Sequence, residues 1–184
     1  PIWEVPEAVL WILDAGEHTD HILDRESKAG GIAQGKRIYI APKKSVREHL
    51  HRLQCADLML DPWPCGGHTS TSESLFAGVP VLALEGTNFA GRVSGSLLRA
   101  AGLECMIQPT IDDYVRTAVH LLRHRPDELA RLQRFVREEV PKTDIFDARS
   151  KARQLESAYR IALERAAKGL APIHIATSRP NRWH

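Results

Sequence analysis

The chain of 184 residues is long enough for one good-sized domain or for half of a two-domain enzyme. Its 25 Lys and Arg residues against 23 Asp and Glu residues give a net charge of +2, which is too small to indicate nucleic-acid binding. No apolar run approaches the length needed to cross a membrane, and three cysteines without CxxC spacing indicate a reducing compartment. We therefore expect a cytoplasmic protein, and the first residue, Pro1 rather than Met, indicates a piece of a longer chain.

The first half of the sequence alternates short apolar runs with helical patterns, which is typical of parallel β-α-β units. Strands are predicted at 8–16, 36–42, 57–64, 79–86 and, as an edge strand, 103–109. Helices are predicted between them at 18–35, 46–56, 71–78 and 91–103. The pattern predicts an α/β fold with a Rossmann-like parallel sheet of four or five strands, which an upstream strand and helix would complete.

From residue 111 onward the sequence becomes helical, with apolar residues at helix spacing and many charges on the opposite face. Helices are predicted within 111–140 and 147–169. We therefore expect a Rossmann-like domain at 1–110, C-terminal helices at 111–169 that pack on it, and a loose or extended tail at 170–184.

The stretch LDPWPCGGHTSTSESLFAG, at 60–78, turns from a strand into a helix and carries a dense group of small hydroxyl residues. In open parallel sheets, ligands bind at this end of the strands. Glycines allow a tight turn, and the first turn of the helix leaves backbone N–H groups unpaired where the helix dipole is positive. Thr69 and Ser70 add hydroxyl donors, and His68 can donate to a phosphate oxygen and stabilise a negatively charged leaving group. The corner therefore predicts an anion site.

The same residues also have a purely structural interpretation. Ser70 and Glu73 have the spacing of a capping box, which would use both side chains to start the helix and is worth about 1 kcal/mol. A capped helix start can still offer N–H groups to an anion, so both interpretations stay open. A second helix start at Gly91 and Arg92, again after a strand, would face the same crevice and favours a ligand site.

The segment from Arg37 to Ile107, which includes RIYIAP and the corner just described, resembles the C-terminal nucleotide-binding domain of O-linked N-acetylglucosamine transferases. It is most similar to the bacterial, SPINDLY-type members. The resemblance continues more loosely through DDYVRTAVHLL, IFDARSKARQLESAYR and GLAPIHI, so that it covers nearly the whole chain.

The resemblance implies the C-terminal half of a glycosyltransferase B fold, in which residues 1–110 bind a nucleotide sugar. Members of the family are hexosyltransferases that use UDP-N-acetylglucosamine to modify Ser and Thr of proteins. No cofactor and no metal are expected. The N-terminal half of the fold, the catalytic histidine, the phosphate-binding lysine and helical tetratricopeptide repeats are expected upstream, so this chain alone would be a donor half-site without turnover.

The resemblance also implies a uridine-binding set. The backbone of Ala41 would bond the uracil edge, with Lys43 beside it. His49 would lie against the uridine, and Arg52 would support that pocket. Glu73 would bind the ribose hydroxyls, in a position where the family usually has Asp.

The diphosphate would be held by His68, Thr69 and Ser70, with His68 stabilising the leaving group. Two positions depart mildly from the family's pattern, since Ser70 replaces a Thr and Gly91 replaces a common Ser. Trp11 is expected in the core or in the wall of the crevice. His120 and His124 have a spacing that can bind zinc, but a solvated helix face is the expected role.

Two alternatives to this function remain open at the level of sequence. The nearest enzyme alternative is a transferase of the same two-domain fold that uses another nucleotide sugar. It would also suit a non-catalytic module that binds nucleotide sugars or acts as a scaffold. An upstream lysine, an active-site histidine and helical repeats would favour the enzyme.

Overall fold

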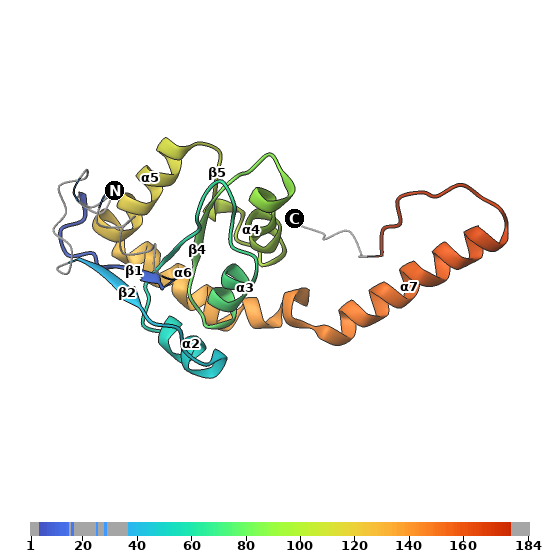
Figure 1. Ribbon diagram of the computed structural model, residues 1–184, viewed down its shortest axis with the longest axis horizontal. Helices are drawn as coiled ribbons and strands as arrows, with labels where there is room; N and C mark the ends of the chain where they lie inside the picture. The colour runs from blue at the N-terminus through green and yellow to red at the C-terminus, as the bar shows by residue number, and fades with distance from the viewer. Residues whose placement is uncertain (1–3, 15, 17–24, 26–27, 29–36, 178–184) are drawn as a thin grey trace. The chain divides into compact units, whose positions relative to one another are not determined.

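The computed structural model describes residues 4–14, 16, 25, 28 and 37–177 (Figure 1). The chain divides into two compact units, Pro1–Val140 and Pro141–His184. Within the described residues, no helix combines the length and the apolar character that a membrane-spanning helix requires. The helix predicted at 18–35 lies outside the described residues, apart from Arg25 and Lys28.

Five short strands, all in the first unit, make up the described β-structure. They are β1 (Leu10–Leu13), β2 (Ile38–Ala41), β3 (Met59–Leu60), β4 (Val81–Leu84) and β5 (Ile107–Gln108). β1 pairs in parallel with β2, with Trp11 opposite Tyr39, and β4 lies between β3 and β5, parallel to both. The five predicted strands are confirmed. The described strands form two sheets rather than one, because β1 has a ladder only with β2 and β3 only with β4.

The core of the first unit surrounds β4. Val81, Leu82 and Ala83 are each 0% exposed, as expected for a strand of a parallel sheet that is covered on both faces. Figure 1 shows α4 on one side of β4 and α5 on the other, and both helices contact this strand. Leu75 and Leu98, from the helices that flank β4 in sequence, are also fully buried.

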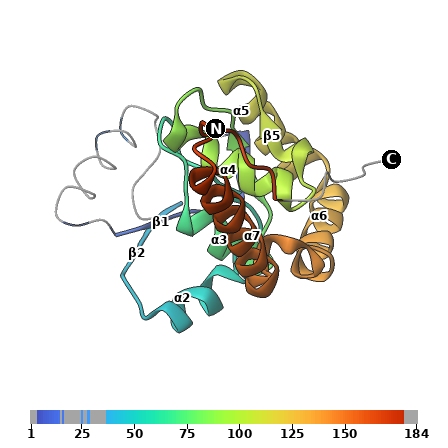
Figure 2. The same ribbon diagram turned by 90° about the vertical axis from the view of Figure 1, so that its right-hand side faces the viewer.

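Helices connect and follow the strands. Those of the first unit are α2 (Val46–Leu53), α3 (Thr69–Phe76), α4 (Phe89–Ala100), the 3₁₀ turn η2 (Glu104–Met106), α5 (Ile111–Val119), the π-turn η3 (His120–His124) and α6 (Pro126–Glu138). Figure 2 shows β1 and β2 side by side, with β2 leading into α2. The order of strands and helices confirms the predicted α/β alternation.

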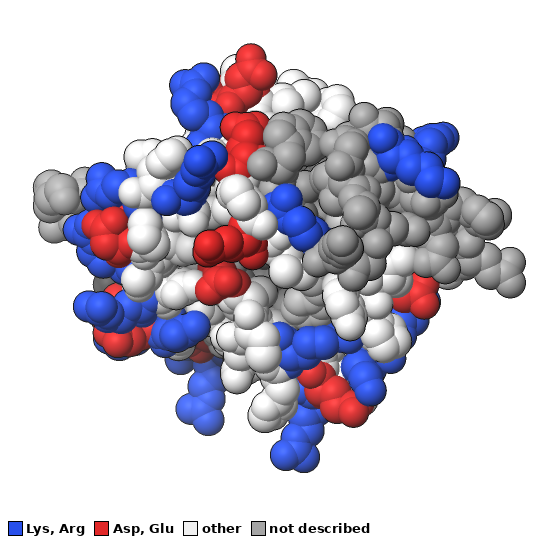
Figure 3. All heavy atoms as spheres, turned by 90° about the vertical axis from the view of Figure 1, so that its left-hand side faces the viewer, with Lys and Arg blue, Asp and Glu red and all other residues white. Residues whose placement is uncertain are grey.

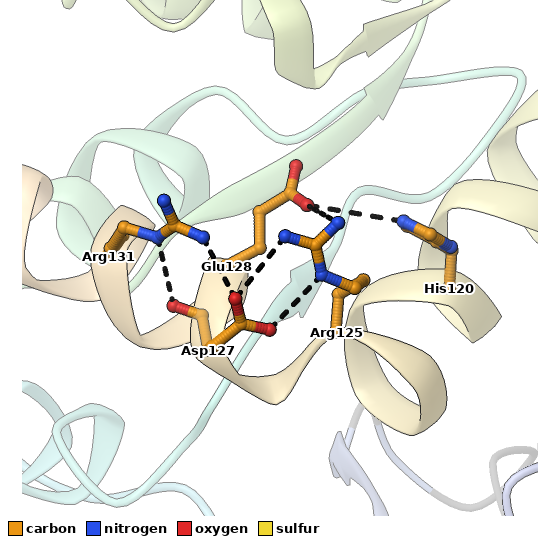
Figure 4. A network of polar contacts seen from close by, with 5 residues as sticks. All are labelled: His120, Arg125, Asp127, Glu128 and Arg131. Carbon is orange, nitrogen blue, oxygen red and sulfur yellow. Dashed lines mark hydrogen bonds and ion pairs between the residues drawn. The ribbon is translucent and has the colours of Figure 1, made fainter.

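The helical stretch predicted at 111–140 is interrupted near Pro126, which lies in the first turn of α6, where a missing N–H is tolerated. Figure 4 shows the polar cluster at this break. Asp127 pairs with Arg125 at 3.1 Å and with Arg131 at 2.8 Å. The hydrogen bond from Arg125 lowers the pKa of Asp127 to about 2. The cluster is solvent-exposed and marks the start of α6.

The division of the chain differs from the domain boundary expected at 110–111. Tyr114 of α5 donates its hydroxyl proton to the Asp61 carbonyl oxygen at 3.0 Å, and burial raises the pKa of this phenol. Gln133 of α6 donates to the Asp57 carbonyl oxygen at 3.1 Å. These contacts across the sequence explain why α5 and α6 belong to the first unit, which ends at Val140.

The second unit contains α7 (Ala148–Ala167), and the short turns η4 (Val140–Lys142) and η5 (Asp144–Phe146) precede this helix. The side chain of Asp147 caps α7 by accepting a hydrogen bond from the Ser150 N–H at 2.9 Å. The helix predicted at 147–169 is therefore confirmed.

Charged side chains of both signs are intermixed on the face shown in Figure 3, over the part that the structure describes. This mixture is consistent with the small net charge of +2.

Candidate functional site

The corner between β3 and α3 is organised by Asp61, a carboxylate that directly follows β3 and is only 4% exposed. Asp61 Oδ1 accepts hydrogen bonds from the Gly67 N–H at 2.7 Å and from the Thr71 hydroxyl at 3.2 Å. Ser94 of α4 donates to the Gly67 carbonyl oxygen at 2.6 Å. Side chains from two other segments thus hold both backbone polar groups of Gly67.

The sequence interpretation missed Asp61, Thr71 and Ser94. The only local signal was an aspartate at the end of an apolar strand, in a corner that had already been singled out. Burial raises the pKa of Asp61 above its ordinary value of 3.8, and hydrogen bonds from Gly67, Ser94 and Thr71 lower it in part. Asp61 is thus a buried hydrogen-bond acceptor that fixes the backbone of the corner through Gly67 and Thr71.

The two corner glycines leave no room for a side chain. A Cβ atom on Gly66 would lie 2.9 Å from Asp61 Oδ2 and 3.0 Å from Ser94 Oγ. A Cβ atom on Gly67 would lie 2.8 Å from Thr71 Oγ1 and 2.9 Å from Asp61 Oδ1. Glycine is therefore required at both positions by the close approach of neighbouring atoms.

The helix after the corner starts without a side-chain cap. α3 begins at Thr69, His68 occupies the N-cap position, and no side-chain hydrogen bond caps the helix. The interpretation of Ser70 and Glu73 as a capping box is therefore wrong, because Ser70 lies inside the first helical turn and Glu73 lies beside His49 of α2. His68, Thr69 and Ser70 are exposed, so this helix start can accept an anion.

The start of α4 lies against the same corner, as the sequence predicted. His68 Nε2 lies 3.3 Å from the Ala90 carbonyl oxygen, and its ring meets the edge of Phe89 at a centroid distance of 6.2 Å. The Gly91 N–H already donates to Asn88 Oδ1 at 2.7 Å, so the Asn88 side chain caps α4 and this N–H has a partner. Arg92, by contrast, is exposed.

A second group of predicted residues gathers where α2 meets α3. His49 Nε2 lies 3.7 Å from a carboxylate oxygen of Glu73, and Arg52 lies 3.0 Å from His49 Nδ1. Arg52 also donates to the carbonyl oxygen of Pro42, directly after β2, at 2.8 Å. The structure thus brings His49, Arg52 and Glu73 together at the carboxyl end of β2.

Ala41 and Lys43 lie next to this group in the chain. Ala41 is buried at the end of β2, and its carbonyl oxygen accepts a hydrogen bond from the Asp14 N–H at 2.9 Å. Lys43 is exposed in the segment that leads to α2. A true capping box, formed by Ser45 and Glu48, starts α2.

The two groups of residues are linked by α3. Thr69 lies at the start of this helix, whereas Glu73 lies four residues later, about 6 Å further along the helix axis. In the part of the chain that the structure describes, no three His, Cys, Asp or Glu side chains gather as a metal site. The candidate site therefore combines an uncapped helix start with an imidazole, a guanidinium and a carboxylate one turn away.

Residues 2–155 match the family model described as glycosyl transferase family 41. The chain belongs to glycosyl transferase family 41. A similar protein of this kind from Hordeum vulgare, a probable UDP-N-acetylglucosamine–peptide N-acetylglucosaminyltransferase SPINDLY, is 36% identical over 125 residues, which make up 68% of this chain and 13% of that protein. A probable UDP-N-acetylglucosamine–peptide N-acetylglucosaminyltransferase SEC from Arabidopsis thaliana is 31% identical over 171 residues, 92% of this chain and 17% of that protein.

The solved structure of a mutant O-GlcNAc transferase from Thermobaculum terrenum matches this family 41 chain with a TM-score of 0.78 and 33% identity. The match covers 86% of this chain and 31% of that one. The predicted family and the predicted parallel α/β fold, the C-terminal half of a glycosyltransferase B fold, are confirmed. The chain spans only 13% and 17% of the length of the two curated relatives.

Proposed function

We propose that this family 41 chain is the donor-binding half of a glycosyltransferase that uses UDP-N-acetylglucosamine to modify Ser and Thr of proteins. The observation that carries the proposal is the uncapped, exposed start of α3 beside His68, with Glu73 one turn further along the same helix. This arrangement offers backbone donors to a diphosphate and a carboxylate to a ribose on one rigid element.

In the proposed complex, the N–H groups at the start of α3 and the hydroxyls of Thr69 and Ser70 bind the pyrophosphate. His68 donates to a phosphate oxygen and stabilises the charge that develops on the departing UDP. Because the backbone N–H groups are fixed by α3 before the nucleotide sugar binds, the protein would contribute positioning and electrostatic stabilisation.

The uridine would lie against the second group of residues. Glu73 would bind the ribose hydroxyls, His49 would lie against the nucleoside, and Arg52 would hold this pocket to the end of β2. The backbone of Ala41, with Lys43 beside it, would bond the uracil edge.

The remaining parts of the proposal concern the partners. The acceptor would be a separate protein. Segments outside this chain would supply the catalytic base, the other half of the fold and the helical repeats. We propose a metal-independent reaction, so chelation with EDTA should leave transfer unchanged.

The three cysteines are all free and exposed, which supports a reducing, cytoplasmic location.

Replacing His68 with Ala is expected to weaken UDP binding about 10-fold, because it removes one hydrogen bond to a charged phosphate oxygen. Titration calorimetry with UDP measures this change. His124→Ala, which removes an exposed histidine in η3, is the matched control and should leave the affinity unchanged. An unaltered affinity in His68→Ala would mean that the corner is a structural turn and not a diphosphate site.

Replacing Glu73 with Gln is expected to weaken UDP binding about 10-fold, whereas binding of 2′,3′-dideoxy-UDP should hardly change. The physical reason is that the carboxylate accepts from ribose hydroxyls that the dideoxy analogue lacks. Glu104→Gln, at an exposed position in η2, serves as the control. Equal losses for the two ligands would remove the ribose assignment.

A transfer assay with radiolabelled UDP-N-acetylglucosamine on the full-length protein tests the activity itself. Transfer of label to protein Ser or Thr supports the proposal. Binding of UDP without transfer from this or any other UDP-sugar would favour a non-catalytic binding module, and transfer from another nucleotide sugar would favour a different donor.

A further inference from the structure

Trp11, in the middle of β1, lies directly beneath the second group of site residues, and the proposed function gives it no role. The guanidinium carbon of Arg52 lies 4.8 Å from the centre of the Trp11 ring. The His49 ring meets the same indole at a centroid distance of 6.4 Å and an interplanar angle of 70°. Trp11 therefore contacts both residues of α2 that face this pocket.

Arg52 is held in three directions. One terminal nitrogen donates to the Pro42 carbonyl oxygen at 2.8 Å, and the other lies 3.0 Å from His49 Nδ1. The guanidinium carbon lies over the Trp11 ring at cation–π distance. Since the guanidinium is planar and its orientation is fixed by the carbonyl oxygen and the indole, the direction of its second N–H group is also fixed.

This geometry determines the tautomer of His49. A guanidinium has only donors, so Nδ1 of His49 must accept the hydrogen bond. The proton of the neutral ring then resides on Nε2, which is the nitrogen that faces the Glu73 carboxylate. In the opposite tautomer, a lone pair on Nε2 would face the carboxylate and two N–H groups would face each other at Nδ1.

The distance between His49 Nε2 and Glu73 is 3.7 Å, which is longer than a hydrogen bond. The Nε2–H donor of His49 and the carboxylate acceptor of Glu73 therefore lie side by side without a hydrogen bond between them. A hydroxyl group can accept from one and donate to the other. His49 and Glu73 can therefore bind a hydroxyl group of the ligand together. This binding requires the proton of the His49 ring to be on Nε2.

We infer that Trp11 and Arg52 are positioning residues that hold His49 as its Nε2–H tautomer, so that His49 and Glu73 together receive a ribose hydroxyl. The inference rests on the proposed function for its ligand. The fixed tautomer itself depends only on Trp11, Arg52 and the Pro42 carbonyl oxygen.

Trp11 Nε1 and Arg52 Nε are both buried and have no hydrogen-bond partner among the described residues. Buried donors without acceptors lower stability, and well-packed structural clusters avoid them. The contacts of Arg52 with Trp11, His49 and the Pro42 carbonyl oxygen fix the orientation of its guanidinium group.

The test is long-range ¹H–¹⁵N NMR on the chain labelled with ¹⁵N-histidine, with the His49 signals assigned from a His49→Gln variant. In the unliganded wild type, the shifts should show an unprotonated Nδ1 and a protonated Nε2. Arg52→Met keeps the length of the side chain and removes the donors, and the single-tautomer signature should give way to a mixture. Arg47→Met, an exposed arginine of the same helix, should leave the signature unchanged.

Ligand binding gives the second readout. Arg52→Met and Trp11→Leu should each weaken UDP binding about 10-fold and 2′,3′-dideoxy-UDP binding clearly less, because the hydroxyl contact depends on the tautomer in addition to the support of the pocket. Arg52→Lys and Trp11→Phe, which keep a cation or an aromatic face, should recover part of both the signature and the affinity. Partial recovery in these two variants would show that the weaker UDP binding of Arg52→Met and Trp11→Leu does not result from unfolding.

An unchanged His49 signature in Arg52→Met, or equal weakening of both nucleotides, overturns the inference. A wild-type chain that shows the Nε2–H signature but binds no UDP would refute the proposed function and leave the tautomer-fixing role of Trp11 and Arg52 intact. The two failures are therefore distinguishable.

Discussion

Replacement of Asp61 by Ala is expected to lower the free energy of unfolding by about 3 kcal/mol, since it removes a buried side chain and leaves the buried Gly67 N–H without its acceptor. The Gly67 N–H loses its acceptor, Asp61 Oδ1, whereas the buried Thr71 hydroxyl loses one partner and keeps the Gly67 carbonyl oxygen at 2.9 Å. Urea unfolding followed by circular dichroism measures the change. UDP binding should also fall, because Gly67 directly precedes the start of α3.

Two control variants sharpen this experiment. Asp61→Asn keeps an oxygen acceptor at the same place and should lose less stability than Asp61→Ala. Asp57→Ala removes an exposed carboxylate near the start of β3 and should change the stability by less than about 0.5 kcal/mol. If Asp61→Ala behaved like Asp57→Ala, the buried network would not be holding the corner.

The pH dependence of the Asp61 contribution has a definite sign. Because burial raises the folded-state pKa above the ordinary value of 3.8, the folded protein binds this proton more tightly than the unfolded chain does. The proton-linked part of the Asp61 contribution is therefore complete below pH 3.8 and is lost as the pH rises through the raised pKa, whereas the hydrogen bond from the Gly67 N–H remains. The stability of the wild type should fall relative to Asp61→Asn over that window, whereas a rise would contradict the assignment.

Replacement of Gly67 by Ala is expected to destabilise the protein by about 3 kcal/mol and to abolish measurable UDP binding. The added methyl group would overlap the Ser70 hydroxyl and lie 2.8 Å from Thr71 Oγ1, and neither atom is at the end of a long, flexible side chain. Relief requires the start of α3 to move, which displaces the N–H groups that face the proposed diphosphate.

Gly95→Ala is the matched control for this variant. Gly95 lies inside α4, where Ala is the better helix former. Its added methyl group would lie 3.2 Å from the flexible end of Arg99 and at ordinary contact distance, 3.8 Å, from Glu85. The same unfolding and calorimetry experiments should show a neutral or stabilising effect. A Gly67→Ala protein with normal stability and normal UDP affinity would contradict the close packing of the corner.

The comparison of two similar sequence patterns shows the limit of local prediction. Ser45 and Glu48 have the same Ser-x-x-Glu spacing as Ser70 and Glu73, yet only the first pair forms a capping box. The second fails because α3 starts at Thr69, so that Ser70 is already inside the helix. Nothing in either tetrapeptide distinguishes the two cases.

The difference arises from contacts far apart in the chain. The start of α3 is set by Gly67, whose carbonyl oxygen is bonded to Ser94, a residue of the next helix. In the same way, the pocket around His49 depends on Trp11 of β1, which the sequence interpretation assigned only to the core or to the wall of a crevice.

Some properties of this protein follow from the sequence by itself. Apolar periodicity and the placement of Gly and Pro determined which segments form strands and which form helices, because these preferences act over a few neighbouring residues. The residues of the corner and of the α2 segment were enough to identify the glycosyl transferase family. Only the tertiary structure decided where α3 starts, that Asp61 lies beneath the corner, and which nitrogen of His49 faces Glu73. Each of these depends on a hydrogen bond or a ring contact between segments distant in sequence, and local patterns carry no information about such pairs.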